Sequence, residues 1–191
     1  IALAFTFGVF VVQAAEYTSE HRFGLLYLFD LPLWLHVLLG VLLLDLCGGY
    51  CIHRIEHHLP FLWRFHIVHH ADKNVDVTTG LRHHPAETIF RLSSQLFAVW
   101  FGGIPIGVVF LYQMISVFFT QWTHANPRSY RKLDHLLSYA FVTPNMHKVH
   151  HHHQKPLTDT NYGNVFSIWD RLFGTFVEVD PASLHYGIDS L

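Results

Sequence analysis

The chain has 191 residues, of which 51% are hydrophobic and only 14% are charged, whereas about 25% are charged in ordinary soluble domains. This length fits one domain, and the composition indicates a membrane protein. A net charge of -2 without a basic stripe gives no electrostatic reason to expect nucleic acid as a partner. Histidine, at 18 residues, is the one residue type in clear excess.

The first apolar stretch, residues 1–15, is uncharged but shorter than the roughly 20 residues that span a bilayer. We interpret it as a truncated span, with the core of a signal peptide as the alternative. A short polar loop is expected over 16–22. A second span is predicted for 23–46, where Pro32 should kink or start the helix and Gly48-Gly49 should end it.

A longer apolar stretch follows between Arg91 and Arg128, where 36 residues contain no Asp, Glu, Lys or Arg. This is too long for one span. The turn signal Gly102-Gly103-Ile104-Pro105 predicts that it folds into a helical hairpin with spans at 89–103 and 104–124.

A hairpin of this kind places residues 47–88 and 123–191 on the same side of the membrane. Ten of the twelve Lys and Arg residues lie in these two segments, so the positive-inside rule predicts that this side is cytoplasmic. The expected fold is therefore all-α: residues 1–191 form one multi-span membrane helical bundle with a cytoplasmic histidine-rich helical cap.

The histidines gather in three clusters on these segments. The unit H-x-x-H-H occurs twice, and H-R-I-E-H adds a pair at i and i+4. On a helix, positions i, i+3 and i+4 lie on one face, so the three imidazoles of a unit should point at one place. Zinc takes four ligands in structural sites and usually three in catalytic ones. Eight histidines therefore suggest two metals: His53, His57, His66, His69, His70, His147, His150 and His151.

Two metal ions with four or five nitrogen donors each need about nine histidines. The expected ninth is His124 in Q-W-T-H-A-N, just past the last apolar segment. Its alternative role is an interfacial hydrogen bond. Imidazole suits zinc, copper, iron and nickel, so ligand type alone does not choose the metal. Four further histidines are reserves, expected to be solvated or beside the ligands: His58, His83, His84 and His152.

The order and content of these motifs resemble one known family. The motifs are H-R-x-x-H, L-W-R-F-H-I-V-H-H-A-D, T-T-G-L-R-H-H-P-A-E, M-H-K-V-H-H and N-Y-G-x-x-x-S-I-W-D-R-L-F-G-T, over residues 45–176. Together they are similar to the fatty acid hydroxylase superfamily, also called the sterol desaturase family. The extra histidines after His151 leave open a shifted ligand set that includes His152 or His153.

The resemblance implies an integral-membrane, non-haem di-iron enzyme that uses O2 to hydroxylate or desaturate a lipid. The eight clustered histidines match the ligands of that family. An unactivated C–H bond resists acid, base and nucleophile, which agrees with an oxidising metal centre protected from water at a membrane face. The sequence contains neither G-x-G-x-x-G after a strand nor C-x-x-C-H, so a separate redox protein is expected to supply the electrons.

Polar residues near the clusters could hold the ligands in place, because metal-bound histidines usually donate their second N–H to a carboxylate or carbonyl. Asp159, Asn161 and Asp170 lie near the third cluster in sequence, and Glu56 lies within the first. The alternatives are a surface ion pair for Asp170 with Arg171, a turn or cap role for Asn161, and a solvated Glu56.

Two other functions fit parts of the sequence. H-R-I-E-H matches the H-x-x-E-H signature of a zinc hydrolase with Glu56 as general base, but this leaves both H-x-x-H-H units without a role. A histidine-rich metal transporter or buffer would need polar groups within the spans, and Asp30, His36 and Asp45 are candidates. Nothing in a purely structural membrane protein calls for three histidine clusters.

Overall fold

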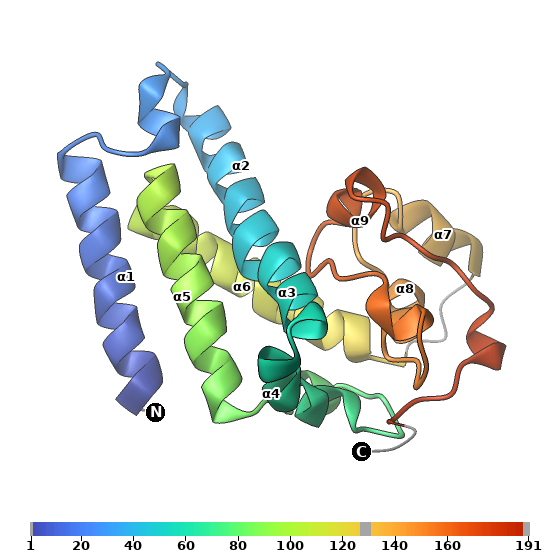
Figure 1. Cartoon of the computed structure of the whole chain (residues 1–191). Coiled ribbons are helices and arrows are strands. Elements are labelled where there is room, and N and C mark those ends of the chain that lie inside the picture. The colour runs from blue at the N-terminus through green and yellow to red at the C-terminus, as the bar shows by residue number, and fades with distance from the viewer. Residues whose placement is uncertain (1, 127–130, 189–191) are drawn as a thin grey trace.

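The computed structural model describes residues 2–126 and 131–188. These residues form helices and loops and include no strand, which confirms the all-α class. The longer helices form a bundle, and most of the shorter ones pack beside one of its ends, whereas the short helix Leu25–Leu28 lies at the other end (Figure 1). In chain order the helices are α1 (Ala2–Glu20), η1 (Leu25–Leu28), α2 (Leu33–Leu44), η2 (Asp45–Cys51), α3 (Ile52–His58), α4 (Pro60–His70), η3 (Thr79–Leu81), α5 (Pro85–Gly102), α6 (Ile106–His124), α7 (Arg131–Leu137), α8 (Pro144–His150), η4 (Leu157–Asp159), α9 (Ile168–Leu172) and η5 (Pro181–Ser183).

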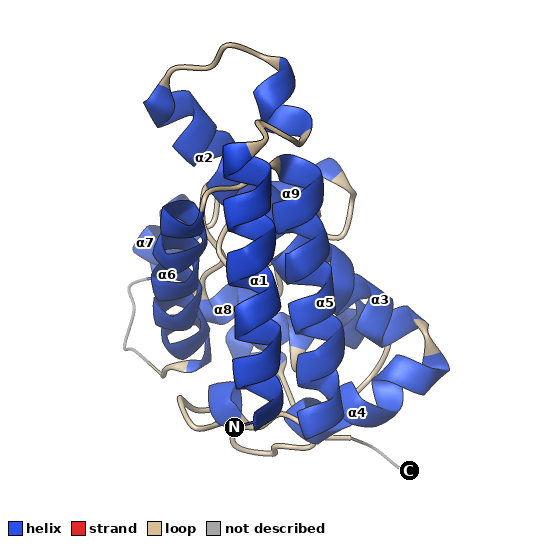
Figure 2. Ribbon diagram, turned by 90° about the vertical axis from the view of Figure 1, so that its left-hand side faces the viewer, coloured by secondary structure: helices blue, strands red, loops and turns tan. Residues whose placement is uncertain are grey.

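The bundle consists of α1, α2, α5 and α6. Figures 1 and 2 show α1 lying along α5, with α2 on the other side of α5 and α6 crossing behind them. Burial of apolar side chains between these helices is the main source of their stability, because hydrophobic burial dominates folding free energies. The buried core comprises Val11, Ala15, Leu26, Val41, Leu44, Ala98, Val99, Ile104, Val108, Val109, Tyr112 and Val165.

The predicted turn between two helices is confirmed at Gly103, between α5 and α6, whereas the membrane crossings of the two helices stay a prediction. Gly103 has φ +71°, and a Cβ there would lie 2.5 Å from the carbonyl oxygen of Phe23. Gly24, with φ +120°, meets Gly103 from the other side, where a Cβ would lie 2.3 Å from the Gly103 nitrogen. Because two backbones approach this closely, glycine is required at both positions. The turn therefore locks the hairpin to the loop that precedes α2.

Two sequence predictions about helix ends are wrong. The polar loop expected over 16–22 is helical as far as Glu20, because no glycine or proline interrupts it and its charged side chains Glu16 and Glu20 face outward. The chain leaves the helix at Arg22, which has φ +48°. The helix is thus longer than the predicted apolar span of 1–15.

The helix that begins after Pro32, as predicted, is not ended by Gly48-Gly49. Neither glycine takes a positive φ, so there is no left-handed stop. The helix widens into a π-helix over Asp45–Cys51 and continues as α3, giving one helical segment over Leu33–His58. The first histidine pair consequently lies on the direct extension of an apolar helix.

Asp45 joins this helix to the C-terminal part of the chain. Its side chain is fully buried, and a buried carboxylate requires hydrogen-bond donors. The four donors are Val165 N (3.2 Å), Phe166 N (3.1 Å), Trp169 Nε1 (2.9 Å) and Tyr112 Oη (3.2 Å). Two backbone amides of the loop before α9 and the indole of Trp169 on α9 thus converge on a single side chain of the bundle.

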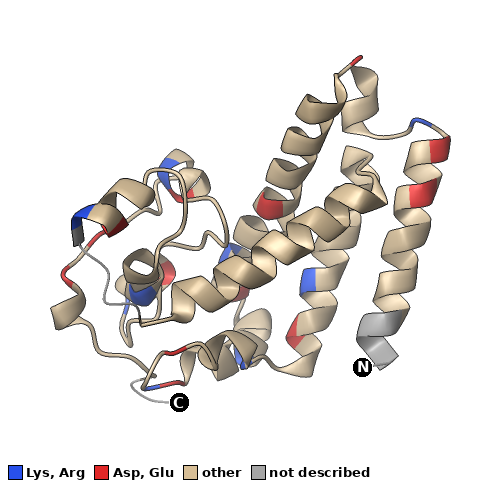
Figure 3. Cartoon of the chain, turned by 180° about the vertical axis from the view of Figure 1, so that it is seen from behind, with Lys and Arg blue, Asp and Glu red and all other residues tan. Residues whose placement is uncertain are grey.

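The histidine-bearing segments lie at the same end of the bundle, as the hairpin prediction required. Helix α3 ends there, α4 follows it directly, and α6 reaches α8 at that end (Figure 1). In Figure 3, α2 and α6 carry no Lys, Arg, Asp or Glu, whereas charged residues lie at the start of α5 and across α7, α8 and α9. Among the described residues, two helical segments are long and apolar enough to cross a membrane: Leu33–His58 and Ile106–His124.

The role of Asp45 can be tested by comparing two substitutions. Asp45→Ala leaves several buried donors without an acceptor and should lower the free energy of unfolding by about 3 kcal/mol. Asp45→Asn keeps one acceptor oxygen and should cost about half as much. The measurement is thermal unfolding of each variant in detergent micelles. Equal unfolding temperatures for the two variants would contradict this role.

Candidate metal centre

The nine predicted histidines come from four helices and meet in the interior. His53 and His57 lie on α3, the three of the first H-x-x-H-H unit on α4, and His124 at the last position of α6. The second unit lies on α8, with His151 directly after its end. All nine side chains are buried, none more than 6% exposed: His53, His57, His66, His69, His70, His124, His147, His150 and His151.

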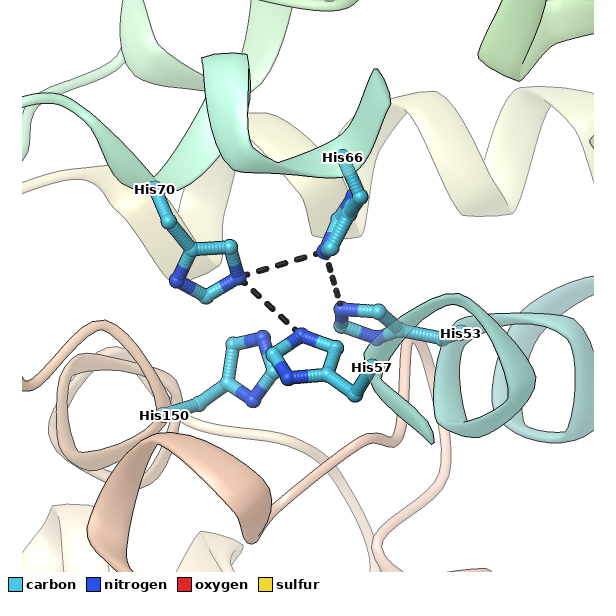
Figure 4. Close-up of side chains that lie close together, drawn as sticks. All are labelled: His53, His57, His66, His70 and His150. Atoms are coloured by element: carbon cyan, nitrogen blue, oxygen red, sulfur yellow. Dashed lines mark hydrogen bonds between the residues drawn. The ribbon is translucent and has the colours of Figure 1, made fainter. Parts of the chain in front are cut away.

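The nine rings form two adjacent clusters. In each cluster, every histidine has a ring nitrogen within 4.8 Å of one on each of the others. Rings of the two clusters touch, as His70 and His151 stack with centroids 4.6 Å apart. The five-histidine cluster, drawn in Figure 4, contains His53, His57, His66, His70 and His150. The four-histidine cluster contains His69, His124, His147 and His151.

The prediction that each H-x-x-H-H unit points at one place is therefore wrong, because each unit is divided between the clusters. His66 and His70 enter the five-histidine cluster while His69 enters the other. On α8 the assignment is reversed, with His150 alone in the five-histidine cluster. A helix turns about 100° per residue, so residues i and i+4 differ by about 40°, whereas i+3 and i+4 differ by about 100°. The i+3 ring therefore reaches a different point.

Six of the nine rings use Nδ1 to donate a hydrogen bond away from the clusters. Because all six acceptors are carbonyl or carboxylate oxygens, Nδ1 carries the hydrogen and Nε2 carries a lone pair in the neutral ring. The pairs are His53 with Tyr162 O (2.8 Å), His57 with Asp159 Oδ1 (3.2 Å), His66 with Glu87 Oε1 (3.0 Å), His69 with Thr79 O (3.1 Å), His124 with Thr120 O (2.7 Å) and His150 with Thr160 O (2.8 Å).

The Nε2 atoms consequently face each other with lone pairs. Those of His53 and His66 are 3.1 Å apart, and those of His69 and His124 are 3.2 Å apart. Burial lowers the pKa of His66 to about 3 and that of His69 well below its usual value, so both rings are neutral at pH 7. Two facing lone pairs repel unless a cation lies between them. Nitrogen ligands about 2.1 Å from one ion are themselves about 3.0–3.4 Å apart, which matches these spacings.

The four-histidine cluster contains a second arrangement that hydrogen bonds alone cannot satisfy. The Nε2 atoms of His124, His147 and His151 form a triangle with sides of 3.1, 3.1 and 3.2 Å. Each neutral Nε2 is either a donor or an acceptor. With three atoms and only two roles, at least two of the atoms must have the same role. At least one pair is therefore mismatched, and a shared cation removes the conflict. The donor set thus fits metal ions in both clusters.

A buried ion-pair network supports the five-histidine cluster from one side. Glu87 Oε1 accepts from His66 Nδ1 (3.0 Å), from His83 Nδ1 (2.9 Å) and from Arg91 Nε (2.8 Å). Arg91 also donates to Glu56 Oε2 at 2.6 Å. Glu56 is buried rather than solvated, and it pairs with Arg91.

Glu87 was not identified from the sequence as a site residue. The signal that could have indicated it is its spacing from Arg91, since an acidic and a basic residue at i and i+4 pair on a helix. The two residues stand at the edge of a long uncharged stretch. Charged side chains that are buried at such a position need partners of opposite charge within the protein.

Asp159 and Asp170 lie near residues 147–151 in sequence, but both support histidines of the first pair instead. Asp159 receives the N–H of His57, which belongs to the first cluster in sequence. Asp170 is buried, so it is not part of a surface ion pair; it accepts from the backbone nitrogens of Tyr162 (2.7 Å) and Gly163 (2.8 Å). The Tyr162 carbonyl in turn accepts from His53. Asp170 thus orients a ligand through the backbone.

Asn161 has the turn role that the sequence offered as the alternative. It takes a left-handed conformation, with φ +52°, and its side chain bonds to Met146 O (2.9 Å) and Val177 O (2.8 Å). It therefore fixes the turn after the third cluster against α8.

The reserve histidines lie outside the two clusters. His83 is nearest, stacked on His69 with centroids 4.7 Å apart and bonded to Glu87. His84 accepts from Ala86 N at the start of α5. His58 is exposed, and His152 accepts from the backbone of His185. His153 is likewise in neither cluster, so the shifted ligand set receives no support.

The general class of this protein is an all-helical protein with an apolar bundle and two buried histidine clusters that fit metal ions. A narrower assignment comes from comparison with known proteins. The chain belongs to the fatty acid hydroxylase family, whose model, described as "Fatty acid hydroxylase", matches residues 37–175. No solved structure gives a significant match.

Curated relatives carry related names. The chain is 32% identical to the ornithine lipid hydroxylase of Rhizobium tropici over 158 residues, covering 82% of this chain and 46% of that protein. It is 30% identical to the human alkylglycerol monooxygenase over 171 residues, covering 84% and 35% respectively. It is 29% identical to a Lecanicillium fatty acid hydroxylase over 181 residues, covering 81% and 46%. The chain thus spans less than half the length of each.

The hydrogen bond from His57 to Asp159 predicts a specific loss of metal affinity. Asp159→Ala frees the His57 ring to rotate and should weaken metal binding about tenfold. The measurement is titration against a competing chelator. Lys155→Ala is the matched control, because Lys155 pairs with the other Asp159 oxygen (2.8 Å) and is 74% exposed. The metal affinity of this variant should stay near that of wild type. Unchanged affinity in Asp159→Ala would show that this bond does not support a ligand.

Proposed function

We propose that the chain is the metal-binding core of an O2-dependent membrane oxidoreductase, in which nine histidines hold two irons that serve to hydroxylate an aliphatic C–H bond of a lipid. The observation that carries this proposal is the set of neutral, buried Nε2 atoms that face one another in two adjacent clusters. Membership in the fatty acid hydroxylase family, and relatives whose names specify lipid and alkylglycerol oxidation, support the same reaction class.

Iron fits the donor set better than zinc. One cluster offers five nitrogen donors, whereas zinc sites are almost always four-coordinate, and zinc has no redox chemistry. Iron accepts imidazole ligands and, when bound, would supply the reduction of O2 to an oxidant able to attack an unactivated C–H bond. The residues of the chain have three tasks: Nε2 atoms hold the metals, the acceptors of Nδ1 orient the rings, and burial excludes water.

The proposed enzyme is an integral multi-pass membrane protein with its histidine clusters on the cytoplasmic face. The long helical segments Leu33–His58 and Ile106–His124 support membrane insertion. We assign α1 and α5 as further spans, because α1 packs along α5 and α5 packs against α2. The concentration of Lys and Arg in the histidine-bearing segments supports the cytoplasmic orientation. One domain over residues 1–191 then carries both the membrane spans and the metals.

The reaction also needs a lipid substrate and two electrons for each turnover. A separate electron-donor protein would supply the electrons, because the sequence has no cofactor motif for that task. Desaturation can begin with the same hydrogen abstraction, so the ligand set serves either outcome. Hydroxylation is favoured by the names of the relatives.

A metal transporter fits the structure less well. Asp30 is fully exposed beside Arg22, His36 bonds to the Gly103 carbonyl, and Asp45 is occupied by four donors. These three residues, which the sequence offered as a route for an ion, serve structural roles instead of lining one path.

Metal content is the first test of this proposal. Protein purified from an iron-replete host, without chelators or a metal-affinity tag, should contain about two irons per chain, because the donors form two clusters. The measurement is elemental analysis, repeated after reconstitution with ferrous iron. One zinc and no iron after reconstitution would favour the hydrolase, and little metal of any kind would favour a transporter.

Single histidine variants test both clusters separately. His150→Ala removes a donor from the five-histidine cluster and His69→Ala one from the four-histidine cluster. Each should lower iron content at least twofold and abolish O2-dependent oxidation of lipid, while the helical circular dichroism signal and membrane insertion persist.

Two exposed histidines provide the controls. His58 follows His57 directly and bonds only within its own helix, and His185 lies far along the chain. His58→Ala and His185→Ala should keep iron content and activity within about twofold of wild type. Activity that survives both His150→Ala and His69→Ala would overturn the di-iron assignment.

A further inference from the structure

A polar cavity lies between α5 and α6, beside the histidine clusters. Its volume is about 220 Å³. Residues of α5 and α6 form most of its wall, and Gly48, His83 and Asn164 contribute the rest. A smaller cavity of about 50 Å³ adjoins it and is lined by histidines of both clusters, His53, His69, His124 and His147. The two cavities share His83, Arg91, Thr120 and Asn164 in their walls.

The polar residues in the larger cavity follow a pattern along each helix. On α6 they are Gln113, Ser116 and Thr120, at i, i+3 and i+7, and on α5 they include Thr88 and Gln95, again seven apart. Residues with this spacing share one face of a helix. Those on α6 interrupt a helix that is apolar enough to cross a membrane. Polar groups are costly in such a helix and usually mark a functional path.

Two amides span the cavity wall. Gln113 Nε2 donates to Gln95 Oε1 at 2.7 Å, which joins α6 to α5. This single bond uses one hydrogen of one amide and one oxygen of the other. The pair keeps further donors and an acceptor for a third group. A ligand with its own donor and acceptor, such as a carboxamide, can bond to both.

The wall provides no cation for a carboxylate. Arg91 is the only Lys or Arg in the lining of either cavity, and both lie within the described part of the chain. Its guanidinium pairs with Glu87 at 2.8 Å and with Glu56 at 2.6 Å. A carboxylate in this cavity would therefore meet a cation that two buried carboxylates already neutralise, and it would lose its hydration without compensation.

We propose that the α5–α6 cavity binds the uncharged polar group of the substrate lipid, an amide in preference to a free carboxylate, through Gln95 and Gln113, and so positions the adjoining alkyl chain at the histidine clusters. This proposal rests on the proposed function for the chemistry that follows binding, but the binding itself can be measured separately. It makes Gln113 a residue that determines specificity.

The test compares two ligands of equal chain length, N-methylpalmitamide and palmitate. Their dissociation constants are measured without O2, on iron-loaded protein in detergent micelles, so that no turnover occurs. The amide should bind at least about tenfold more tightly than palmitate, which corresponds to one or two hydrogen bonds. Equal affinities, tighter binding of palmitate, or binding of neither ligand would overturn the proposal.

Variants locate the preference at Gln113. Gln113→Leu should weaken amide binding about tenfold and leave palmitate unchanged. Gln113→Arg places a cation in the cavity and should reverse the order of the two ligands. Met114→Leu is the matched control, since Met114 is the next residue of α6 and is 73% exposed. If the Gln113→Leu variant unfolds and loads iron like wild type but keeps the full preference for the amide, the assignment of Gln113 is wrong.

Separate measurements distinguish this proposal from the proposed function. Iron content and oxidation of the bound amide with O2 and a reductant test the function alone. An amide preference without oxidation in the iron-loaded protein would leave the cavity assignment in place and reject the oxygenase. Oxidation of lipid without any preference for the amide would support the oxygenase and reject the cavity assignment.

Discussion

The repulsion between neutral imidazole lone pairs is the constraint on which the histidine-bearing end of the molecule depends. Six rings are held by Nδ1 hydrogen bonds that direct their Nε2 lone pairs inward, and burial keeps rings such as His66 unprotonated. Such an arrangement is unfavourable by itself and becomes favourable with a cation at its centre. The surrounding acceptors, including Glu87 and the Tyr162 carbonyl, then serve one purpose, which is to fix the rings in the orientation that a cation requires.

The bundle places these rings by extending its own helices into the site. The apolar segment that begins at Leu33 continues without a break to His57, and α6 ends at His124. Asp45 ties the loop before α9 to the same bundle, and Asp170 on α9 holds the backbone of Tyr162, whose carbonyl accepts the His53 hydrogen. Histidines from distant parts of the sequence are thus brought together by elements that the bundle anchors, and the proposed metal chemistry would need that positional precision.

The sequence predicted the helical class, the hairpin at Gly103 and the convergence of nine histidines, because periodicity, turn residues and spacing are local signals. It failed where the outcome depends on three-dimensional context. The division of each H-x-x-H-H unit depends on what faces the helix on either side, and the continuity through Gly48-Gly49 depends on backbone angles that glycine leaves open. Glu87 and the change of partner for Asp159 were missed for the same reason, since both bonds join residues far apart in the chain. Membrane topology and metal identity remain predictions.

The division of the two H-x-x-H-H units between the clusters has a consequence for metal loading. Helices α4 and α8 each contribute to both clusters, so an ion in one cluster restricts the helices that must also form the other. The conformational cost of ordering α4 and α8 is then met largely by the first ion, and the second binds to a site already in place. Loading should therefore be cooperative, with few molecules holding a single ion. In the proposed di-iron centre, such loading would leave the site either complete or empty and would limit the exposure of a half-filled site to O2.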